Sequence, residues 1–327
     1  MFDVTGSAIE ATLARIRPHV RRTPAWESPA LSERFSRRVS VKLECLQLGG
    51  SFKARGVAAK LLSMDAAQRS RGVVAVSGGN HAIAVARGAA AFGVDALVLM
   101  PRVTAAFNIN ETKRYGARVE LVDTAAEAFA KAEDLAAQGR TNLHAYDDPV
   151  IIAGNGTVGL EFIEDVPDLT HVFVSIGGGG FSTGVAAAVK ARRPQAQVIG
   201  VETEGAETMT AALAAGAPVT IKPTSIARTL GAPFVTARTL AGARELLERV
   251  DVVPDGAAVA DMLWLLQTEK VLCEPAASCT VSALERALDG VPADAHVGLI
   301  LCGSNIAVAD LATLAAQFGL QGDSASR

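Results

Sequence analysis

The sequence predicts an α/β fold in which helices flank parallel or mostly parallel sheets. Short runs of β-branched residues alternate with Ala-rich stretches along the 327 residues. This alternation is typical of parallel sheets covered by crossover helices. Hydrophobic residues make up 50% of the chain, which is enough for a large core, and the length suggests about two domains.

The individual elements follow from this alternation. The expected strands are residues 39–43, 73–76, 96–100, 119–122, 171–175, 198–202 and 297–301. The expected helices are residues 55–62, 81–92, 108–115, 127–138, 154–165, 181–192, 208–215, 241–247, 257–267 and 307–318. Residues 321–327 are expected to fray, since they are mostly small or polar.

Composition excludes several classes of function. The net charge is -3 and basic residues form no run longer than a pair, which argues against a nucleic-acid partner. The N-terminus lacks the apolar segment of a signal peptide, and no window of 18 apolar residues predicts a membrane span. The four cysteines form no C-x-x-C pair, so we expect free buried thiols and a cytoplasmic protein: Cys45, Cys273, Cys279 and Cys302.

Three glycine-rich segments are expected to form turns that open helices. They are Ser77–Asn80, Gly154–Gly159 and Gly177–Gly180. Unpaired N–H groups at a helix start suit an anion. Four consecutive glycines carry a high entropic cost, which close approach of the backbone to a phosphate would justify.

The Gly154–Gly159 segment matches G-x-G-x-x-G and raises the alternative of a nicotinamide-dependent oxidoreductase. That function needs an acidic residue about 20 positions further on. The corresponding stretch, Val174–Gly177, contains no acid. The oxidoreductase is therefore the disfavoured alternative from a different class of enzyme.

Lys53 stands between the aromatic Phe52 and a glycine-flanked turn, in the segment Gly50–Gly56 (G-S-F-K-A-R-G). A lysine held in this way can be partly buried. Burial lowers the pKa of its amine and makes it a better nucleophile toward a carbonyl.

At this point the sequence resembles a known family. Lys42–Gly56 resembles the cofactor-lysine motif of fold-type II pyridoxal phosphate enzymes, in the serine/threonine dehydratase and serine racemase branch. Further landmarks of that family are matched, in order, by Ser77–His81, Asp147–Gly154, Gly177–Gly180, Leu272–Pro275 and Leu301–Asn305. The resemblance implies two doubly wound parallel or mostly parallel sheets, with the active site between two domains. Residues 1–65 and 150–327 would form the large cofactor-binding domain and residues 66–149 the small one.

The resemblance also implies a role for each matching residue. Lys53 would carry pyridoxal 5'-phosphate as a Schiff base and act as general base. The other expected cofactor contacts are Phe52 and Cys302 on the pyridine ring, Asn80 on its hydroxyl, and the N–H groups of Gly177, Gly178, Gly179 and Gly180 on the phosphate. The expected substrate contacts are Ser77, Gly78, Gly79 and His81, largely through backbone N–H groups around the carboxylate. Glu274 would lie near the ring, with its role left open.

The implied reaction is β-elimination of a 3-hydroxy amino acid, such as threonine, serine or phenylserine, to a 2-oxo acid and ammonia. A neutral Cys302 beside the ring nitrogen would make the ring a weaker electron sink, which favours expulsion of a β-leaving group. Alternatives within the fold are an amino-acid racemase, a β-replacement enzyme of the cysteine-synthase kind, and a catalytically silent cofactor binder. The only small-molecule partner implied is the amino acid, and relatives are commonly homodimers.

Several positions depart from the family pattern. Gly78 stands where racemases place a Ser as second base, so we expect elimination without efficient racemisation. Small or apolar residues at Leu48, Gly49 and Gly78 remove bulk, which predicts room for a larger β-substituent such as phenyl. Arg228 and Thr229 replace Asp and Gly, which leaves the geometry of that loop open.

A metal site also remains an open question in the sequence. Some relatives bind a divalent cation through a Glu, a backbone carbonyl and an Asp. Glu202 and Ala206 match the first two positions, but Thr208 replaces the Asp. Loss of a charged oxygen ligand weakens a site for a hard cation.

Overall fold

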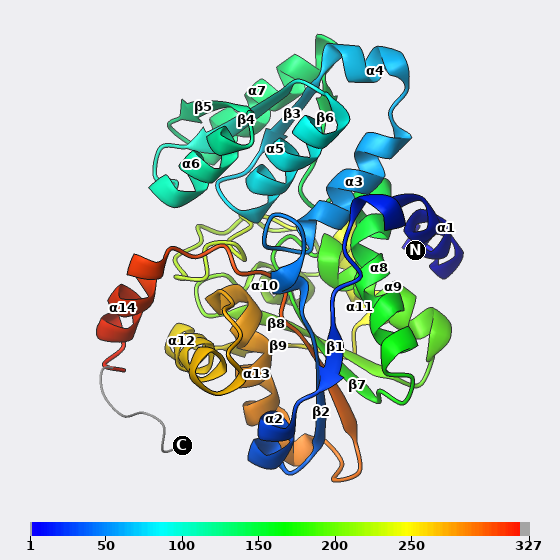
Figure 1. The fold of residues 1–327 in the computed structure, drawn as a ribbon, viewed down its shortest axis with the longest axis vertical. Helices are drawn as coiled ribbons and strands as arrows, with labels where there is room; N and C mark the ends of the chain where they lie inside the picture. The colour runs from blue at the N-terminus through cyan, green and yellow to red at the C-terminus, as the bar shows by residue number, and fades with distance from the viewer. Residues whose placement is uncertain (1, 321–327) are drawn as a thin grey trace.

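The computed structural model describes residues 2–320, so the predicted frayed segment 321–327 lies outside the described residues. Helices and strands alternate as predicted, and the α/β class is confirmed (Figure 1). The strands are β1 (Ala25–Glu27), β2 (Arg38–Lys42), β3 (Val73–Val76), β4 (Ala96–Pro101), β5 (Arg118–Val122), β6 (Thr141–Asn142), β7 (His171–Ser175), β8 (Gln197–Thr203), β9 (Arg249–Val253) and β10 (His296–Ile300).

Helices connect and cover these strands. They are α1 (Gly6–Ile16), α2 (Pro29–Phe35), α3 (Lys53–Ser63), α4 (Ala66–Arg71), α5 (Asn80–Phe92), α6 (Ala106–Arg114), α7 (Ala125–Ala137), α8 (Pro149–Asp165), α9 (Gly180–Arg192), α10 (Thr208–Ala215), α11 (Ala237–Leu246), α12 (Asp255–Trp264), α13 (Pro275–Ala287) and α14 (Val308–Gln317). Shorter helical turns lie at Arg17–His19, Glu44–Leu46, Leu265–Glu269 and Leu288–Gly290. No helix in the described part of the chain is long and apolar enough to cross a membrane.

The strands form two sheets. The larger sheet has the order β1-β2-β10-β7-β8-β9, and every pairing in it is parallel except that of β1 with β2. The smaller sheet, at the top of Figure 1, has the order β5-β4-β3-β6 and is parallel throughout. Along β3, Val73 and Ala75 pack with α5, whereas Val74 packs with α7, as the two-residue period of a strand requires. Helices therefore cover both faces of this sheet.

The carboxyl ends of four strands lead into the segments that the sequence singles out. Gly177–Gly180 follows β7, Leu301–Asn305 follows β10, Lys53 lies beyond β2, and Ser77–Asn80 follows β3 of the smaller sheet. In open α/β sheets, ligands bind beyond the carboxyl ends of the strands. The helix α3, which begins at Lys53, contacts α5 of the smaller unit and α8 of the larger one. This places Lys53 between the two sheets.

The prediction that Gly154–Gly159 opens a helix is wrong, because these glycines lie in the middle of α8. A Cβ at Gly154 would come within 2.7 Å of Gly56 Cα in α3. A Cβ at Gly156 would come within 2.7 Å of the Gly184 carbonyl oxygen in α9. The glycine pattern therefore lets three helices pack at close range, and the segment has no free helix start to offer a dinucleotide.

Several elements have no counterpart among the sequence predictions: α1, β1, α2, α4, β6, β9 and α13. The helix α13 (P-A-A-S-C-T-V-S-A-L-E-R-A) is buried along all but its last turn, so its small polar residues Ser278, Thr280 and Ser282 do not mark a solvent-exposed face. The strands β1 and β6 have only three and two residues, too few for a visible alternation. The four cysteines are free and buried, as predicted.

Candidate active site

Lys53 is the first residue of α3, and its amine is held by backbone from a distant segment. Its Nζ donates a hydrogen bond to the Ala145 carbonyl oxygen at 2.7 Å and lies 5.1 Å from the centre of the Phe52 ring. Burial of the ammonium lowers the pKa of Lys53 to about 8. A neutral amine, which is the nucleophilic form, is therefore accessible near neutral pH.

Phe52 precedes the lysine and is anchored on two sides. Its ring stacks on that of Phe181, with 3.7 Å between centroids and 17° between planes. Its backbone N–H donates to the Cys302 carbonyl oxygen at 3.1 Å. These contacts bring the lysine segment, the start of α9 and the segment after β10 together.

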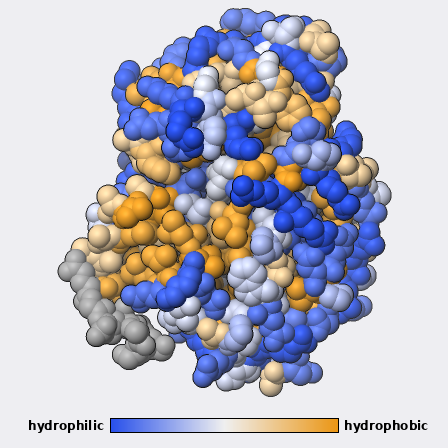
Figure 2. Space-filling model, viewed as in Figure 1, coloured by the Kyte–Doolittle hydropathy of each residue, from blue (hydrophilic) through white to orange (hydrophobic). Residues whose placement is uncertain are grey.

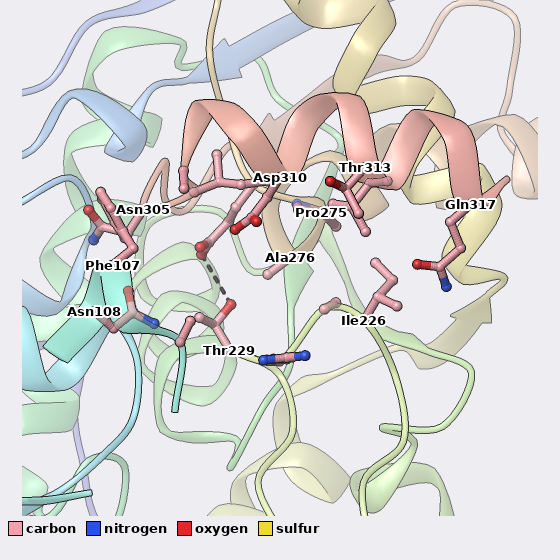
Figure 3. Close-up of a pocket in the computed structure, with 17 residues that line it drawn as sticks. Phe107, Asn108, Ile226, Thr229, Pro275, Ala276, Asn305, Asp310, Thr313 and Gln317 are labelled. Atoms are coloured by element: carbon pink, nitrogen blue, oxygen red, sulfur yellow. Dashed lines mark hydrogen bonds between the residues drawn. The ribbon is translucent and has the colours of Figure 1, made fainter. Parts of the chain in front are cut away.

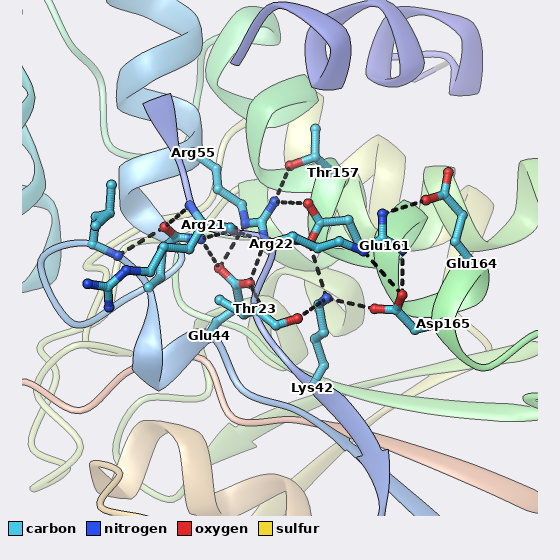
Figure 4. Close-up of polar contacts among 12 residues, drawn as sticks. Arg21, Arg22, Thr23, Lys42, Glu44, Arg55, Thr157, Glu161, Glu164 and Asp165 are labelled. Carbon is cyan, nitrogen blue, oxygen red and sulfur yellow. Dashed lines mark hydrogen bonds and ion pairs between the residues drawn. The ribbon is translucent and has the colours of Figure 1, made fainter. Parts of the chain in front are cut away.

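A buried ion network adjoins the first turn of α3, which begins at Lys53. It consists of Lys42, Glu44, Arg55 and Glu161 (Figure 4). Arg55 is fully buried, and its guanidinium donates to both Glu44 oxygens at 2.9 and 2.7 Å and to both Glu161 oxygens at 2.9 and 2.7 Å. Lys42 lies 3.1 Å from Glu161. Because Arg55 lies in the first turn of α3, the network ties the start of that helix to α8 and to the turn after β2.

Gly177–Gly180 form the turn between β7 and α9. Their four backbone N–H groups have no hydrogen-bond acceptor among residues 2–320. A Cβ at Gly178 would fall 2.2 Å from the Tyr146 ring, and one at Gly180 would fall 2.3 Å from the Tyr146 carbonyl oxygen. Gly179 has φ +90°, which side chains rarely adopt. Glycine is therefore required here, and the free N–H groups suit a phosphate.

The turn Ser77–Asn80 opens α5, and side chains from two other loops cover its glycines. A Cβ at Gly78 would lie 2.5 Å from Thr104 Oγ1, and a Cβ at Gly79 would lie 3.0 Å from Thr229 Cγ2. Ser77 Oγ accepts a hydrogen bond from the Gly79 N–H at 3.1 Å. The expectation of spare room at Gly78 is therefore corrected, because Thr104 already fills that space.

The surroundings of Gly49 and His81 also differ from what the sequence suggests. A Cβ at Gly49 would make ordinary contacts with the side chains of Arg87 and Ile83 at 3.5 and 3.8 Å, so this glycine leaves little more space than a methyl group needs. The His81 ring is buried and hydrogen-bonds the Leu143 carbonyl oxygen through Nε2 at 2.8 Å. Burial, with a smaller effect from the Lys53 charge, lowers the pKa of His81 to about 3. Its Nδ1 is buried and has no hydrogen-bond partner among the described residues.

Asn80 belongs to a polar network that sequence reasoning missed. Its amide nitrogen donates to Glu274 Oε1 at 2.5 Å, and its oxygen accepts from Asn305 Nδ2 at 2.6 Å. Thr229 Oγ1 also donates to Glu274, at 3.1 Å. Burial raises the pKa of Glu274 to about 7. The atypical Thr229 therefore has a definite place, between Glu274 and Gly79.

Cys302 is buried directly after β10. Its Sγ donates to the Ala276 carbonyl oxygen at 3.4 Å and lies 3.8 Å from Ser175 Oγ. Burial raises the pKa of this thiol well above its ordinary value. Cys302 is thus a neutral group, as the sequence comparison requires for a partner of a ring nitrogen.

Glu202, the first residue of the cation site that the sequence left open, has hydrogen-bond partners for both of its oxygens. Its two oxygens accept hydrogen bonds from Met209 N at 2.7 Å, Thr210 N at 2.9 Å and Thr210 Oγ1 at 2.7 Å. Thr208 turns its hydroxyl to the Ala232 carbonyl oxygen. Within the described residues, no group of three or more His, Cys, Asp or Glu could hold a metal ion. Glu202 instead caps α10.

A cavity of about 270 Å³ opens beside the Asn80 network and runs beneath α14 (Figure 3). At its inner end lie Asn108, Thr229, Glu274 and Asn305, three of which belong to that network. Phe107 lies beside Asn108 and Asn305 at this end (Figure 3). Away from it the lining is mixed: Ile226, Pro275, Ala276 and Leu314 are apolar, whereas Arg228, Asp310, Thr313 and Gln317 are polar or charged. These residues come from four separate segments, so no local sequence pattern indicates the cavity.

These features fit pyridoxal phosphate. An amine with a lowered pKa can bind the aldehyde, four free N–H groups can bind the phosphate, and Asn80 and Cys302 present neutral polar groups for the ring. Each of the segments involved reaches the same region from a different strand end. The arrangement is therefore suited to a cofactor held covalently at one end and by its phosphate at the other.

Comparisons with known proteins agree with this assignment of chemistry. The model of the family described as "Pyridoxal-phosphate dependent enzyme" matches residues 16–303. Phenylserine dehydratase from Ralstonia pickettii is 37% identical, with 96% of each chain covered, and L-threonine ammonia-lyase from Thermotoga maritima is 35% identical, with 93% of this chain and 76% of the relative covered. The structure of maize serine racemase is similar with a TM-score of 0.89 at 31% identity, covering 96% of this chain and 97% of that one.

Proposed function

The chain belongs to the family of pyridoxal-phosphate dependent enzymes, and from this premise we propose that it is an ammonia-lyase for 3-hydroxy amino acids. The reaction removes the α-hydrogen and the β-hydroxyl of the substrate as water. The resulting enamine hydrolyses to a 2-oxo acid and ammonia. The observation that carries the proposal is Lys53, an amine of lowered pKa between the two sheets, in a chain whose relatives include dehydratases of phenylserine and threonine.

We propose that the residues around Lys53 hold the cofactor and the substrate as follows. Gly177, Gly178, Gly179 and Gly180 bind the phosphate, Phe52 and Cys302 contact the pyridine ring, and Asn80 binds the ring hydroxyl. Ser77, Gly78, Gly79 and His81 surround the substrate carboxylate at the start of α5, where the Gly79 N–H would exchange its bond to Ser77 Oγ for one to the carboxylate. When bound, pyridoxal phosphate supplies an electron sink that acidifies the α-hydrogen of the amino acid.

The chain itself supplies the base and its position. Lys53 Nζ takes the α-proton, and the Ala145 carbonyl oxygen, 2.7 Å away in the free amine, orients it. The Asn80–Glu274 hydrogen bond, with Thr229 and Asn305, fixes the amide that would bind the ring hydroxyl. The neutral Cys302 does not hold the ring nitrogen protonated, so loss of the β-hydroxyl is the favoured fate of the charge developed at Cα.

Racemisation is the second candidate, because a maize serine racemase shares the fold. Gly78 has no side chain to move a proton, which favours elimination. Thr104 Oγ1 occupies the neighbouring space, but in the described chain it contacts no acid or base that could activate it. We therefore expect purified enzyme to convert L-serine to pyruvate much faster than to D-serine.

A panel of L-serine, L-threonine and phenylserine, followed by release of 2-oxo acid and ammonia, tests the proposal. Lys53→Ala should lose turnover and the visible absorbance of the bound cofactor together. Turnover that survives in Lys53→Ala would contradict the role of this residue. Racemisation of serine at a rate comparable to elimination would favour the second candidate.

We propose further that the two sheets belong to a large domain, residues 1–65 and 150–327, and a small domain, residues 66–149. The larger sheet takes all its strands from the first set, and the smaller sheet takes all its strands from the second. We also propose a homodimer in the cytoplasm. Light scattering of the purified holoenzyme and fractionation of the source cells test these two points.

A further inference from the structure

We propose that the cavity beneath α14 receives the β-substituent of the substrate, and that this substituent is large and mostly apolar, such as an aryl group. The proposal rests on the proposed function, because it concerns the substrate of the same site. It replaces the sequence argument from Gly78 and Gly49, since Thr104 fills the space at Gly78 and Gly49 leaves room for little more than a methyl group.

The cavity starts where the expected carboxylate site ends. Asn108 lines it and donates from Nδ2 to the Gly78 carbonyl oxygen at 2.8 Å. Asn305 lines it and bonds Asn80 at 2.6 Å. Neither Lys53 nor the turn Ser77–Asn80 lines the cavity, so these two hydrogen bonds are its link to the expected substrate site. A substrate whose carboxylate lies at that turn would direct its β-substituent past Asn108 into the cavity.

Asn108 also offers a contact for the hydroxyl of the substrate. Its Oδ1 is buried and has no hydrogen-bond partner among the described residues, although its Nδ2 is fixed by Gly78. A buried acceptor without a partner is costly, and a β-hydroxyl can satisfy it as a donor. The inner end of the cavity can therefore bind the 3-hydroxyl group, and the space beyond it can hold the substituent on the β-carbon.

The size and lining of the cavity favour an aryl group over hydrogen or methyl. The volume is about 270 Å³, whereas an engineered apolar cavity of about 150 Å³ in another protein holds benzene. Phe107, Ile226 and Leu314 supply apolar walls, and Arg228, Asp310, Thr313 and Gln317 supply the polar part of the lining. Figure 2 shows that apolar surface continues over α14 and α12 beside the cavity. Burial of a phenyl ring here should raise kcat/KM over that of serine by about 10- to 100-fold.

The test compares two tryptophans on neighbouring positions of α14. Thr313 and Ala312 are both exposed, but only Thr313 lines the cavity. No residue of α14 is fully buried, so both Thr313→Trp and Ala312→Trp should fold. We expect Thr313→Trp to lower kcat/KM for phenylserine about tenfold or more while leaving serine within about twofold. Ala312→Trp should change neither.

The outcomes separate this inference from the proposed function. If wild-type enzyme prefers serine to phenylserine, or if Thr313→Trp lowers both substrates equally, the cavity is not the β-substituent site, although the ammonia-lyase stands. If no 3-hydroxy amino acid yields a 2-oxo acid with the cofactor-loaded enzyme, the proposed function itself fails. Thermal melting of both variants as holoenzymes checks that the fold is unchanged.

Discussion

The two sides of Lys53 differ in how completely their polar groups are satisfied. Behind it, the guanidinium of Arg55 is saturated by Glu44 and Glu161, and Lys42 completes a buried ion network (Figure 4). In front of it, Gly177–Gly180 leave four N–H groups without acceptors, and Asn108 leaves a carbonyl oxygen without a donor, within the part of the chain that the structure describes. The saturated side can only support the site, whereas the unsatisfied side can receive a ligand.

The largest expected effect is a loss of stability on removing the guanidinium of Arg55 from the buried ion network. Arg55→Met leaves two buried carboxylates without their guanidinium and should lower the free energy of unfolding by about 3–5 kcal/mol. Arg22 pairs with Glu164 and Asp165 at the exposed edge of the same region, and Arg22→Met should cost less than about 1 kcal/mol. Urea denaturation of the apo forms measures both. Equal losses in the two variants would show that burial of the network does not matter.

The next effect is a loss of cofactor affinity on distorting the turn Gly177–Gly180. Gly178→Ala places a Cβ about where the Tyr146 ring lies and should displace the N–H groups that we assign to the phosphate. We expect the affinity for pyridoxal phosphate to fall about 100-fold, since several charge-assisted hydrogen bonds are lost. Gly290→Ala is the matched control, because nothing lies within 4 Å of its added Cβ. A cofactor titration that is unchanged in Gly178→Ala would contradict the phosphate site.

The third effect is the pH dependence of the apo enzyme. Burial lowers the pKa of Lys53 to about 8, below its ordinary value, so the unfolded chain holds this proton more tightly than the folded one. The stability contributed by Lys53 therefore rises with pH between about 8 and 10.5, and the penalty is complete below pH 8. Lys53→Met should make the apo protein more stable than wild type near neutral pH, with the difference shrinking as the pH rises. A difference independent of pH would argue against a buried ammonium.

The sequence was informative where a residue lies in a contiguous motif at a strand end. The α/β class follows from alternation, and Lys53, Asn80, Gly177–Gly180 and Cys302 lie in segments that the fold brings to one region. The sequence was misleading where one residue type serves two structural roles. Gly154–Gly159 has the spacing of a turn but packs inside α8, because glycine serves close helix packing as well as tight turns.

The contacts that could not be predicted join residues far apart in the chain. Thr104 fills the space at Gly78, Thr229 covers Gly79, and Asn305 holds Asn80 across 225 positions. None of these pairs leaves a local period or spacing. The cavity beneath α14 likewise depends on four segments meeting, so its existence and its size come only from the three-dimensional arrangement.

The central claim is that Lys53, and no other lysine, carries the cofactor. Reduction of the cofactor-loaded enzyme with borohydride makes that bond permanent, and peptide mass spectrometry then locates the added mass. The account predicts the label on the peptide containing Lys53, and its disappearance in Lys53→Ala. A label on another lysine, such as the buried Lys42, would contradict the account.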